Sequence, residues 1–466
     1  MDTRNAAKLP FRLKFGYGAS DGAQSAIWIL YSLYFLYFLT DIVKLDPAIA
    51  GSILLIGTIW DAINDPLVGI WSDNTRSKWG RRRPFIIGVV VPFSIFTWLL
   101  FTDFGLAKTW TIVYFIVMVI LYDAAYTILC VPYSALAAEM TQDYNERTSI
   151  MMFRAIWSNS SNIIAAATAL LIANYFGQKF GSIKVGWSVM AAIFAVLMIF
   201  PNVYTWHVTR GYELFPKHTH FNLKEILMAV IKNRPFFYAI GLWLGGEVGT
   251  TVGSAVMIYF MTYHMGFAEN QSSLAFLLLF GSTLIWIPLI NLTSSKIGKK
   301  WAFIIYVGLW AILMGIGIIL VKPENVIFFY ILTFFVSSGV VGVYLIGYSI
   351  MADVVEVDEF KTGKRREGVY FGLMAFVQKI GSAFALWAIG LVLHFIGYVP
   401  NVPQTTKALW GIRILYAEGT TFFLIIGIIA CYLMPITKDK HQALVEAIKL
   451  KKENKKYDVE AFKDLL

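Results

Sequence analysis

Long apolar segments recur along the whole chain, and they constrain its fold more than any other feature. Runs of about 20 residues with almost no charge are long enough to cross the hydrocarbon core of a bilayer. One such run can be a buried helix of a soluble protein, but no soluble core is large enough to bury a long series of them. Hydrophobic residues make up 58% and charged residues 15% of the 466 residues, whereas a soluble domain is roughly half apolar and a quarter charged. The sequence therefore predicts an α-helical protein that spans the membrane many times.

Basic residues gather in particular loops, and their distribution predicts the orientation of the chain. The net charge is +10. Most lysines and arginines lie near the termini and in four loops, at residues 76–84, 210–234, 296–300 and 361–367. The alternate loops near Lys44, Lys108 and Lys322 carry few. Because cytoplasmic loops are enriched in lysine and arginine, we expect an inner (plasma) membrane protein with both termini in the cytoplasm, an even number of spans and no nucleic acid partner.

Twelve spans fit this pattern. They lie near residues 16–41, 48–72, 84–103, 109–136, 150–175, 186–206, 235–263, 271–294, 302–321, 326–351, 369–396 and 416–435. The polar, lysine-rich tail at 436–466 has a helical pattern, and it either rests on anionic lipid or is solvated. Cys130 and Cys431 lie in apolar runs, so we expect neither a disulfide nor a zinc site.

An internal repeat predicts the domain organisation. The segment SKWGRRRPFII at 77–87 is similar to SKIGKKWAFII at 295–305, 218 residues later. The segment YSALAAEM at 133–140 is similar to YSIMADVV at 348–355, 215 residues later. The sequence therefore predicts an N-terminal six-helix bundle (1–206), a cytoplasmic loop (207–234), a C-terminal six-helix bundle (235–435) and a cytoplasmic tail (436–466). Folds of this kind bind substrate near the middle of the membrane, between halves that rock.

Charged side chains inside the predicted spans indicate function, because each costs at least ~2.5–3.5 kcal/mol near the bilayer centre. They are Asp21, Asp61, Asp65, Asp123, Arg154, Glu247 and Lys379. Asp61 and Asp65 are four residues apart and share one helical face, so they repel each other unless a cation bridges them or one is protonated. Asn64 and the Thr127 hydroxyl add oxygen ligands that suit Na⁺, and a proton could serve the same pocket. Alternatively, these residues join helices by hydrogen bonds or by pairing with Lys379.

Aromatic and amide side chains accompany these charges: Tyr17, Tyr126, Trp157, Asn159, Asn162, Tyr344 and Gln378. Sugars are commonly held by aromatic rings, with carboxylates and a guanidinium at their hydroxyl groups. Trp157 and Tyr344 lie inside spans beside charges, which favours them as sugar contacts. Aromatic side chains in membrane proteins also serve as interfacial anchors or in packing.

Several of these segments resemble one known family. The stretch IWDAINDPLVGIWSDNTRSKWGRRRPF at 59–85 resembles the second span and following loop of the glycoside–pentoside–hexuronide:cation symporters. These symporters are a branch of the major facilitator superfamily that includes the melibiose permeases. Four further segments resemble the family in the same order: YGASDG (17–22), YTILCVPYSAL (126–136), MADVVEVDEFKTGKRREG (351–368) and KIGSAFA (379–385). The resemblance implies an all-α major facilitator fold and cation-coupled sugar symport, with no enzymatic activity and no cofactor besides the co-transported Na⁺ or H⁺.

The resemblance also implies roles for individual residues. A cation site, with Na⁺ at Asp61 and Asp65, is implied at Asp61, Asn64, Asp65 and Thr127. Sugar binding is implied at Asp21, Arg154 and Tyr344, and Lys379 is implied to couple the cation to the sugar. A cytoplasmic gate is implied at Arg81, Arg82, Arg83, Asp353 and Glu356.

The chain also departs from the family pattern in the sugar site. Cys130 replaces a sugar-binding aspartate of the melibiose permeases, Ser134 a tryptophan, and Ser20 a lysine. We therefore expect a glycoside other than theirs. Asp123 and Glu247 have no counterpart in the family pattern, and we expect them to bind substrate in place of the lost groups.

Two alternatives to a sugar symporter are considered. The first is a lipid transporter of the same fold, and the second is a membrane-embedded enzyme. Animal relatives of the family move lysophospholipids along a cation gradient, and 36 phenylalanines supply apolar surface for such a cargo. The Asp21 and Arg154 pair favours a polar cargo instead. A membrane-embedded enzyme is disfavoured because the six histidines are scattered and no nucleophile elbow or phosphate-binding loop occurs.

Overall fold

The computed structural model describes residues 8–141, 143–212, 233–363 and 366–453, together with residues 230, 455, 462 and 465. These residues form helices and no strand. The elements are α1 (Phe11–Tyr37), η2 (Phe38–Ile42), α2 (Pro47–Asn74), α3 (Arg83–Leu100), α4 (Lys108–Met140), α5 (Tyr144–Lys179), α6 (Ile183–Leu197), α7 (Ile199–Val208), α9 (Arg234–Tyr259), η3 (Phe260–His264), α10 (Glu269–Gly281), α11 (Thr283–Ile297), α12 (Lys299–Ile312), η4 (Leu313–Gly317), α13 (Ile318–Leu320), α14 (Val326–Thr362), α15 (Glu367–Phe395), α16 (Thr406–Ile414), η5 (Leu415–Gly419), α17 (Thr420–Leu433) and α18 (Lys438–Lys452), where η marks a π-helical turn.

Several helices start at residues whose side chains can cap them. The Asp46 carboxylate accepts a hydrogen bond from the first turn of α2, and Pro47 occupies the first helical position. Asp143 and Thr437 accept equivalent bonds at the starts of α5 and α18. A helix start leaves backbone N–H groups without an intrahelical partner, and these side chains satisfy one of them. Backbone groups in the interior of a helix bond within it, which is the requirement for crossing a bilayer.

Within the described residues, helices joined end to end form twelve long bodies that precede the tail helix α18. Eleven bodies are long and apolar enough to cross a membrane. The twelfth, α9 with η3, falls outside that set and carries Glu247 in the glycine- and threonine-rich stretch LGGEVGTTVG. The prediction of a helical protein with many spans is confirmed. One helix is clearly longer than predicted. The predicted span ends near residue 351, whereas α14 continues to Thr362.

The chain divides into two compact units. The N-terminal unit comprises Met1–His218, Phe267–Phe280 and Leu386–Ala408, and the C-terminal unit comprises Thr219–Gly266, Gly281–Ala385 and Leu409–Leu466. Two short segments of the predicted C-terminal bundle therefore group with the N-terminal unit. Most of the predicted loop at 207–234 lies outside the described residues.

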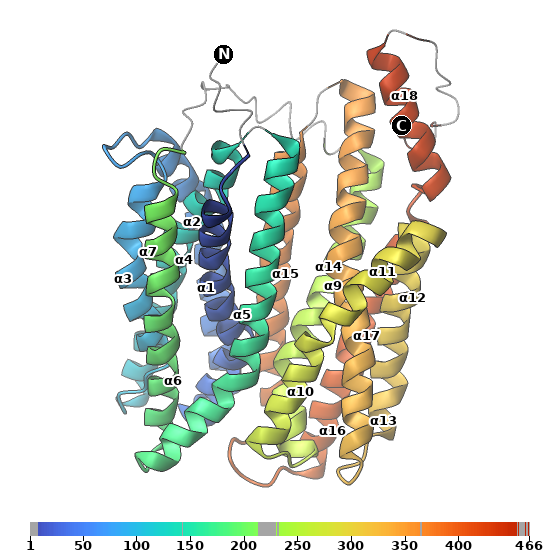
Figure 1. Ribbon diagram of the computed structural model, residues 1–466. Coiled ribbons are helices and arrows are strands. Elements are labelled where there is room, and N and C mark those ends of the chain that lie inside the picture. Colours follow the sequence, from blue (N-terminus) through green and yellow to red (C-terminus); the bar gives the residue numbers. More distant parts are fainter. Residues whose placement is uncertain are drawn as a thin grey trace. The chain divides into compact units, whose positions relative to one another are not determined.

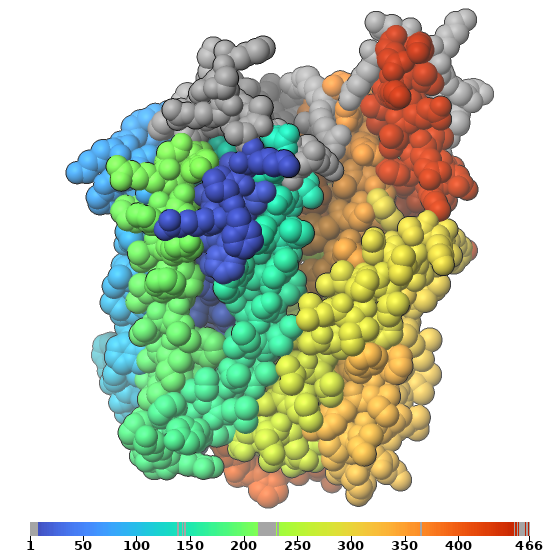
Figure 2. All heavy atoms as spheres, in the orientation of Figure 1, coloured from blue at the N-terminus to red at the C-terminus, as the bar shows by residue number. Residues whose placement is uncertain are grey.

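In the N-terminal unit, small residues let α1 approach its neighbours closely. A Cβ atom on Gly18 would lie 2.8 Å from the Phe153 carbonyl oxygen of α5, and one on Gly22 would lie 2.8 Å from the Ser161 hydroxyl. Glycine at such positions allows helix backbones to come together inside a membrane. Figure 2 shows the start of α1 between α5 and α7 on one face of this unit. Phe200 of α7 is 74% exposed, as expected for a side chain that meets lipid.

The segment Leu386–Ala408 of the N-terminal unit packs against the start of α2. A Cβ atom on Gly390 would lie 2.4 Å from the Pro47 carbonyl oxygen and 3.0 Å from the Gly51 Cα. His394 Nδ1 lies 2.8 Å from Asp46 Oδ2. The Tyr398 hydroxyl donates to Asp41 Oδ1 at 2.6 Å. These contacts join the last turns of α15 to α2, and the turn after α15 to η2.

In the C-terminal unit, α9 packs between α14 and α17. A Cβ atom on Gly245 would lie 2.5 Å from the Gly427 nitrogen of α17, and one on Gly246 would lie 2.6 Å from Val343 of α14. These contacts hold the middle of α9 close to both neighbours. Figure 1 shows the tail helix α18 beside the end of α14, where Leu444 and Ala447 are buried. The described part of the predicted tail is thus a helix that docks on the protein.

Candidate functional site

Two carboxylates of α2 converge on one hydroxyl of α4. Thr127 Oγ1 lies 2.8 Å from Asp61 Oδ1 and 3.0 Å from Asp65 Oδ1. Asp61 is 6% exposed and Thr127 is 1% exposed. A hydroxyl has one proton to donate, so it cannot satisfy both carboxylates at once. Two carboxylates that share one hydroxyl repel each other, and a proton or a cation between them would relieve that repulsion.

Asn64 lies on the same buried stretch of α2. Its side chain is 7% exposed, and its Nδ2 atom has no hydrogen-bond partner among the described residues. Rotation of the amide group by half a turn exchanges its oxygen and nitrogen, so the group can offer either a donor or an acceptor. Asp61, Asn64, Asp65 and Thr127 together provide the oxygen atoms that hard cations prefer.

Asp123 lies near this carboxylate pair. It is 5% exposed, and its Oδ2 atom would lie 2.6 Å from a Cβ atom on Gly57 of α2. Asp123 and Asp61 are both close enough to Tyr31 and Tyr122 to interact with them electrostatically. The N-terminal unit therefore gathers a third carboxylate near Asp61, one helical turn before Thr127.

A second charged pair joins α1 to α5. Asp21 Oδ1 accepts hydrogen bonds from Arg154 Nη2 at 2.6 Å and from Arg154 Nε at 2.9 Å. The Arg154 guanidinium lies 5.1 Å from the ring centre of Tyr133 and 5.9 Å from that of Tyr17. The side chains of Arg154 and Asp21 are 22% and 17% exposed. The pair is thus neither sealed nor fully solvated, and it can exchange its mutual hydrogen bonds for bonds to a polar ligand.

Tyr17 and Tyr133 form the platform below this pair. Their rings stack with centres 4.4 Å apart, and each hydroxyl donates to the backbone carbonyl of the other residue, at 2.6 and 2.7 Å. Sequence reasoning missed Tyr133, although it begins the repeated segment YSALAAEM. Trp157 lies one turn after Arg154 on α5, and its ring makes an edge contact with Phe15 at 5.1 Å.

The C-terminal unit has its own buried carboxyl group. Gln378 Nε2 of α15 donates to Glu247 Oε1 at 2.9 Å, and the Tyr344 hydroxyl of α14 also bonds to this carboxyl. The two predicted substrate residues Glu247 and Tyr344 are therefore in contact. Lys379 follows Gln378 on α15 and belongs to this unit, whereas Asp61 belongs to the other. Its coupling to the cation site stays a prediction.

The predicted gate residues form one ionic cluster in each unit. In the N-terminal unit, Arg81 and Arg82 pair with Glu139, with Arg82 Nε at 3.0 Å from Glu139 Oε1. Arg83 instead donates to the backbone carbonyl of Trp206 at 2.6 Å. All three arginines are buried. The repeated basic loop therefore anchors the start of α3 to the end of α4.

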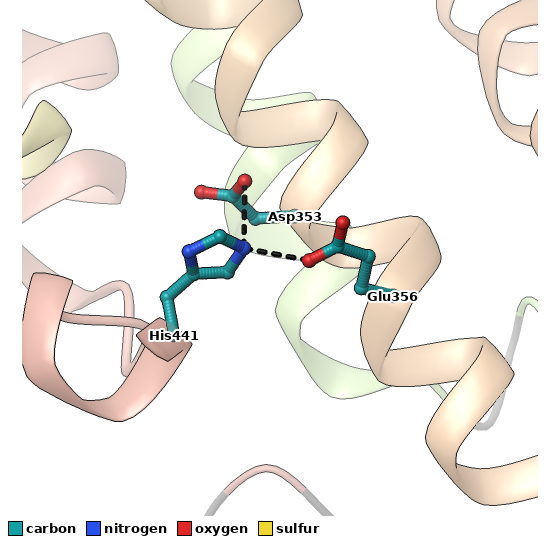
Figure 3. Close-up of side chains that lie close together, drawn as sticks. All are labelled: Asp353, Glu356 and His441. Carbon is teal, nitrogen blue, oxygen red and sulfur yellow. Dashed lines mark hydrogen bonds and ion pairs between the residues drawn. The ribbon is translucent and has the colours of Figure 1, made fainter. Parts of the chain in front are cut away.

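The corresponding cluster of the C-terminal unit includes the tail helix. Lys299 Nζ, at the start of α12, lies 2.6 Å from Asp353 Oδ1 of α14. Figure 3 shows the His441 imidazole of α18 directed between Asp353 and Glu356. Its Nε2 atom lies 2.6 Å from Glu356 Oε2 and 3.2 Å from Asp353 Oδ1. The Glu356 hydrogen bond raises the pKa of His441 against the opposing effect of burial, and Asp353 raises this pKa further.

Within the described residues, Asp353, Glu356 and His441 are the one group of three or more histidine, cysteine and acidic side chains close enough to share a metal ion. Their separations are those of charge-assisted hydrogen bonds, and the Lys299 ammonium already neutralises Asp353. A cavity of about 270 Å³ beside them is lined by further basic groups, Lys300 and Lys438. Cations on this side disfavour a metal, so we interpret the group as an ionic contact between α14 and α18.

Comparisons with known proteins agree with this architecture. The family model described as MFS/sugar transport protein matches residues 16–438. An uncharacterized symporter of Synechocystis sp. is 30% identical, over 97% of this chain and 98% of its own length. The isoprimeverose transporter of Lactiplantibacillus pentosus is 29% identical, over 88% of this chain and 85% of its own length. The crystal structure of the nucleoside transporter NupG covers 90% of this chain and 99% of its own, with a TM-score of 0.61 at 15% identity, which is a likeness of fold alone.

Proposed function

Because this chain belongs to the MFS/sugar transport protein family, we propose that it is a cation-coupled symporter that carries a sugar or glycoside by alternating access. The resemblance stated from the sequence is confirmed by the family match, as is the major facilitator fold. The chain is therefore a multi-span membrane transport protein and not an enzyme. The observation that carries the proposal is the convergence of Asp61 and Asp65 on Thr127, in the unit that also holds the Asp21–Arg154 pair.

The carboxylate pair supplies the energetic reason for coupling. Without a cation, repulsion between Asp61 and Asp65 opposes the arrangement in which both face Thr127. A bound cation removes that repulsion and holds α2 and α4 together. If the cation tightens sugar binding, the sugar must tighten cation binding by the same factor. The gradient of the cation can then drive uptake of the sugar.

Na⁺ is our preferred coupling ion. The site offers two carboxylates, a hydroxyl and an amide at close range, which suits an ion that binds several oxygen atoms. A single shared proton would satisfy the carboxylate pair without using Asn64. We propose that Lys379 links ion binding to sugar binding. The gate residues of both units are then proposed to link this binding to the movement of the halves.

The sugar site is proposed at the Asp21–Arg154 pair and its aromatic neighbours. Arg154 and Asp21 offer donors and acceptors that match sugar hydroxyls, and the stacked tyrosines keep the pair in place. Buried groups of this kind reject a wrong ligand, because it leaves them without partners. The isoprimeverose transporter among the relatives supports a glycoside cargo, and nothing in the described residues favours a lysophospholipid. We propose that the protein lies in the inner membrane with both termini in the cytoplasm.

Counterflow in proteoliposomes tests the proposal. A panel of labelled mono- and disaccharides, isoprimeverose among them, is assayed with Na⁺, with Li⁺ and at low pH without either. We expect the protein to exchange one glycoside of the panel. Na⁺ should stimulate this exchange, and added lysophospholipid should not inhibit it. Asp61→Cys and Asp65→Cys should abolish Na⁺-driven accumulation and leave the protein folded. Wild-type accumulation by both variants, or the absence of any exchanged sugar, would contradict the proposal.

A further inference from the structure

Among the described residues, Glu247 differs in its partners from three carboxylates that face cations. Asp21 contacts Arg154, Glu139 contacts two arginines and Asp353 contacts Lys299. Glu247 is 5% exposed, and its contacts among the described residues of its unit are neutral: Gln378 at 2.9 Å, Ser382 at 3.5 Å and the Tyr344 hydroxyl. The distances to Gln378 and Ser382 are both measured from the same carboxyl oxygen of Glu247, Oε1.

The second oxygen of this carboxyl group, Oε2, is buried and has no hydrogen-bond partner among the described residues. An ionised carboxylate that is removed from water without a cation loses several kcal/mol of hydration free energy. An anionic oxygen without a donor adds to that cost. A proton on Oε2 removes the charge and leaves two neutral donors, Gln378 and Ser382, on Oε1, which match the two lone pairs of a carbonyl oxygen. The surroundings therefore favour the neutral acid.

The helices around Glu247 hold the group in place. Gly245 and Gly246 press α9 against α17 and α14. On the α15 side, a Cβ atom on Gly381 would lie 2.4 Å from Leu244 and 3.1 Å from Val248. Close packing on three sides holds the backbone that carries this side chain in a fixed position.

A neutral Glu247 presents a hydrogen-bond donor, and a second unused donor lies one helical turn earlier. Trp243 is fully buried, and its Nε1 atom also has no partner among the described residues. Its ring makes an edge contact with Tyr344, 5.6 Å away, so Tyr344 touches both residues. A buried donor needs an acceptor, and a sugar is rich in hydroxyl oxygens that accept.

We propose that Glu247 is a proton-binding site whose protonated carboxyl donates a hydrogen bond from Oε2 to a hydroxyl oxygen of the transported sugar. The inference rests on the proposed function and deepens it, because sugar binding then requires a proton at Glu247 besides the cation at Asp61 and Asp65. One proton is taken up from water when Glu247 becomes neutral, and the same proton is released when it ionises. No bond of the sugar changes.

Infrared difference spectroscopy tests the protonation without any substrate. The protein is reconstituted in nanodiscs, and the carbonyl band of a protonated carboxyl is followed as the pH rises. We expect a band that Glu247→Gln removes and that Glu418→Gln retains, because Glu418 is an exposed glutamate of the same unit. If Glu247→Gln leaves the band unchanged at every pH, Glu247 is not protonated and the proposal is wrong.

Equilibrium binding of the sugar found by counterflow, at saturating cation, tests the role of the proton. At pH values above the one at which Glu247 loses its proton, the affinity of the wild-type protein for the sugar should fall by about tenfold per pH unit. Glu247→Gln keeps a neutral donor of similar shape, so its affinity should be independent of pH and within several fold of the wild-type value at low pH. Glu247→Leu removes the donor, and its affinity should be low at every pH.

Three results of this assay would overturn the proposal: loss of binding by Glu247→Gln at low pH, a wild-type affinity that is flat with pH, and one pH dependence shared by both proteins. Each is separable from failure of the proposed function. If the wild type exchanges no sugar, or if Asp61→Cys and Asp65→Cys accumulate it normally, the symport assignment fails. The infrared result at Glu247 still stands in that case.

Discussion

At the scale of single residues, the Thr127 hydroxyl is the group that most directly reports on the cation site. We expect Thr127→Val to raise the Na⁺ concentration for half-maximal stimulation about fivefold, since one hydrogen-bonding group contributes about 1 kcal/mol. Valine has nearly the same shape, so the protein should fold. Thr127→Ser keeps the hydroxyl and should behave like the wild type. Sugar exchange at several Na⁺ concentrations measures the effect, and equal Na⁺ dependence in all three proteins would remove Thr127 from the site.

Residues that carry charge inside an apolar span were the ones that the sequence could predict. Helical periodicity predicted that Asp61 and Asp65 share one face, and the family resemblance implied that Thr127 joins them. The structure brings the three side chains together, and their role as a cation site stays a prediction. Tyr133 and Trp243 were not predicted, because an aromatic side chain in a membrane helix most often packs against its neighbours or anchors at an interface. Only coordinates show that one stacks beneath Arg154 and that the other has an unused N–H.

At the scale of elements, the tail helix α18 docks on α14 through a titratable contact. His441 faces Glu356 and Asp353 of α14 and Lys299 of α12; both carboxylates favour its charged form, whereas Lys299 and burial oppose it. Because the docked pKa of His441 is raised above its ordinary value of 6.5, the contact stabilises docking fully below that value. The stabilisation is lost as the pH rises through the raised pKa.

Spin labels on Glu446 of α18 and Leu345 of α14, both exposed, can follow this docking after Cys130 and Cys431 are replaced by serine. We expect a narrow distance distribution at pH 6 that broadens at pH 9. His441→Gln should give one pH-independent distribution. His394→Gln is the control, since His394 belongs to the N-terminal unit. A pH response that persists in His441→Gln would show that another group titrates.

Helices and their order were largely predictable from hydropathy, but their ends were not. The predicted second span at 48–72 differs from α2 by two residues or fewer at each end, whereas α14 extends 11 residues beyond the predicted 351. The extension carries Asp353, Glu356 and other charged residues, which hydropathy assigns to a loop. In the structure, Asp353 is buried but paired with Lys299, and Asp358, further along, is paired with Arg366. These partners offset the cost of burying the charges, so α14 continues as a helix.

At the scale of the whole molecule, the internal repeat predicted two halves, and the ionic clusters at Glu139 and Asp353 occupy related places in them. Each cluster joins the start of a helix after a basic loop to the end of the following long helix. The sequence could not predict that residues 386–408 would group with the N-terminal unit. In this group, Gly390 lies close to Gly51 of α2. A glycine in a sequence does not indicate which helix it contacts, so this approach is seen only in the structure.

The grouping of Leu386–Ala408 with α2 predicts a contact that must break during transport. Under the proposed mechanism of alternating access, this segment of the predicted C-terminal bundle should separate from α2 when the predicted external side opens. The Asp46–His394 and Asp41–Tyr398 bonds, together with the close Gly51–Gly390 approach, hold it in place. A covalent link across this contact should therefore stop the cycle with the cytoplasmic side still able to bind sugar.

A reducible bifunctional thiol reagent applied to Asp46→Cys/His394→Cys, with Cys130 and Cys431 replaced by serine, makes this link. We expect loss of at least nine-tenths of counterflow, recovery after reduction, and sugar binding from the cytoplasmic side that stays within a few fold of normal, since the bonds broken are roughly 1 kcal/mol each. Each single cysteine should be unaffected. The control pair is Thr102→Cys/Ser188→Cys, which replaces two hydroxyl groups that lie 2.8 Å apart within the N-terminal bundle. A link between these cysteines should leave transport intact, because both positions belong to one bundle that moves as a unit. Full transport by the linked Asp46/His394 pair would mean that α2 and the end of α15 stay joined throughout the cycle, and the external opening would then have to form elsewhere.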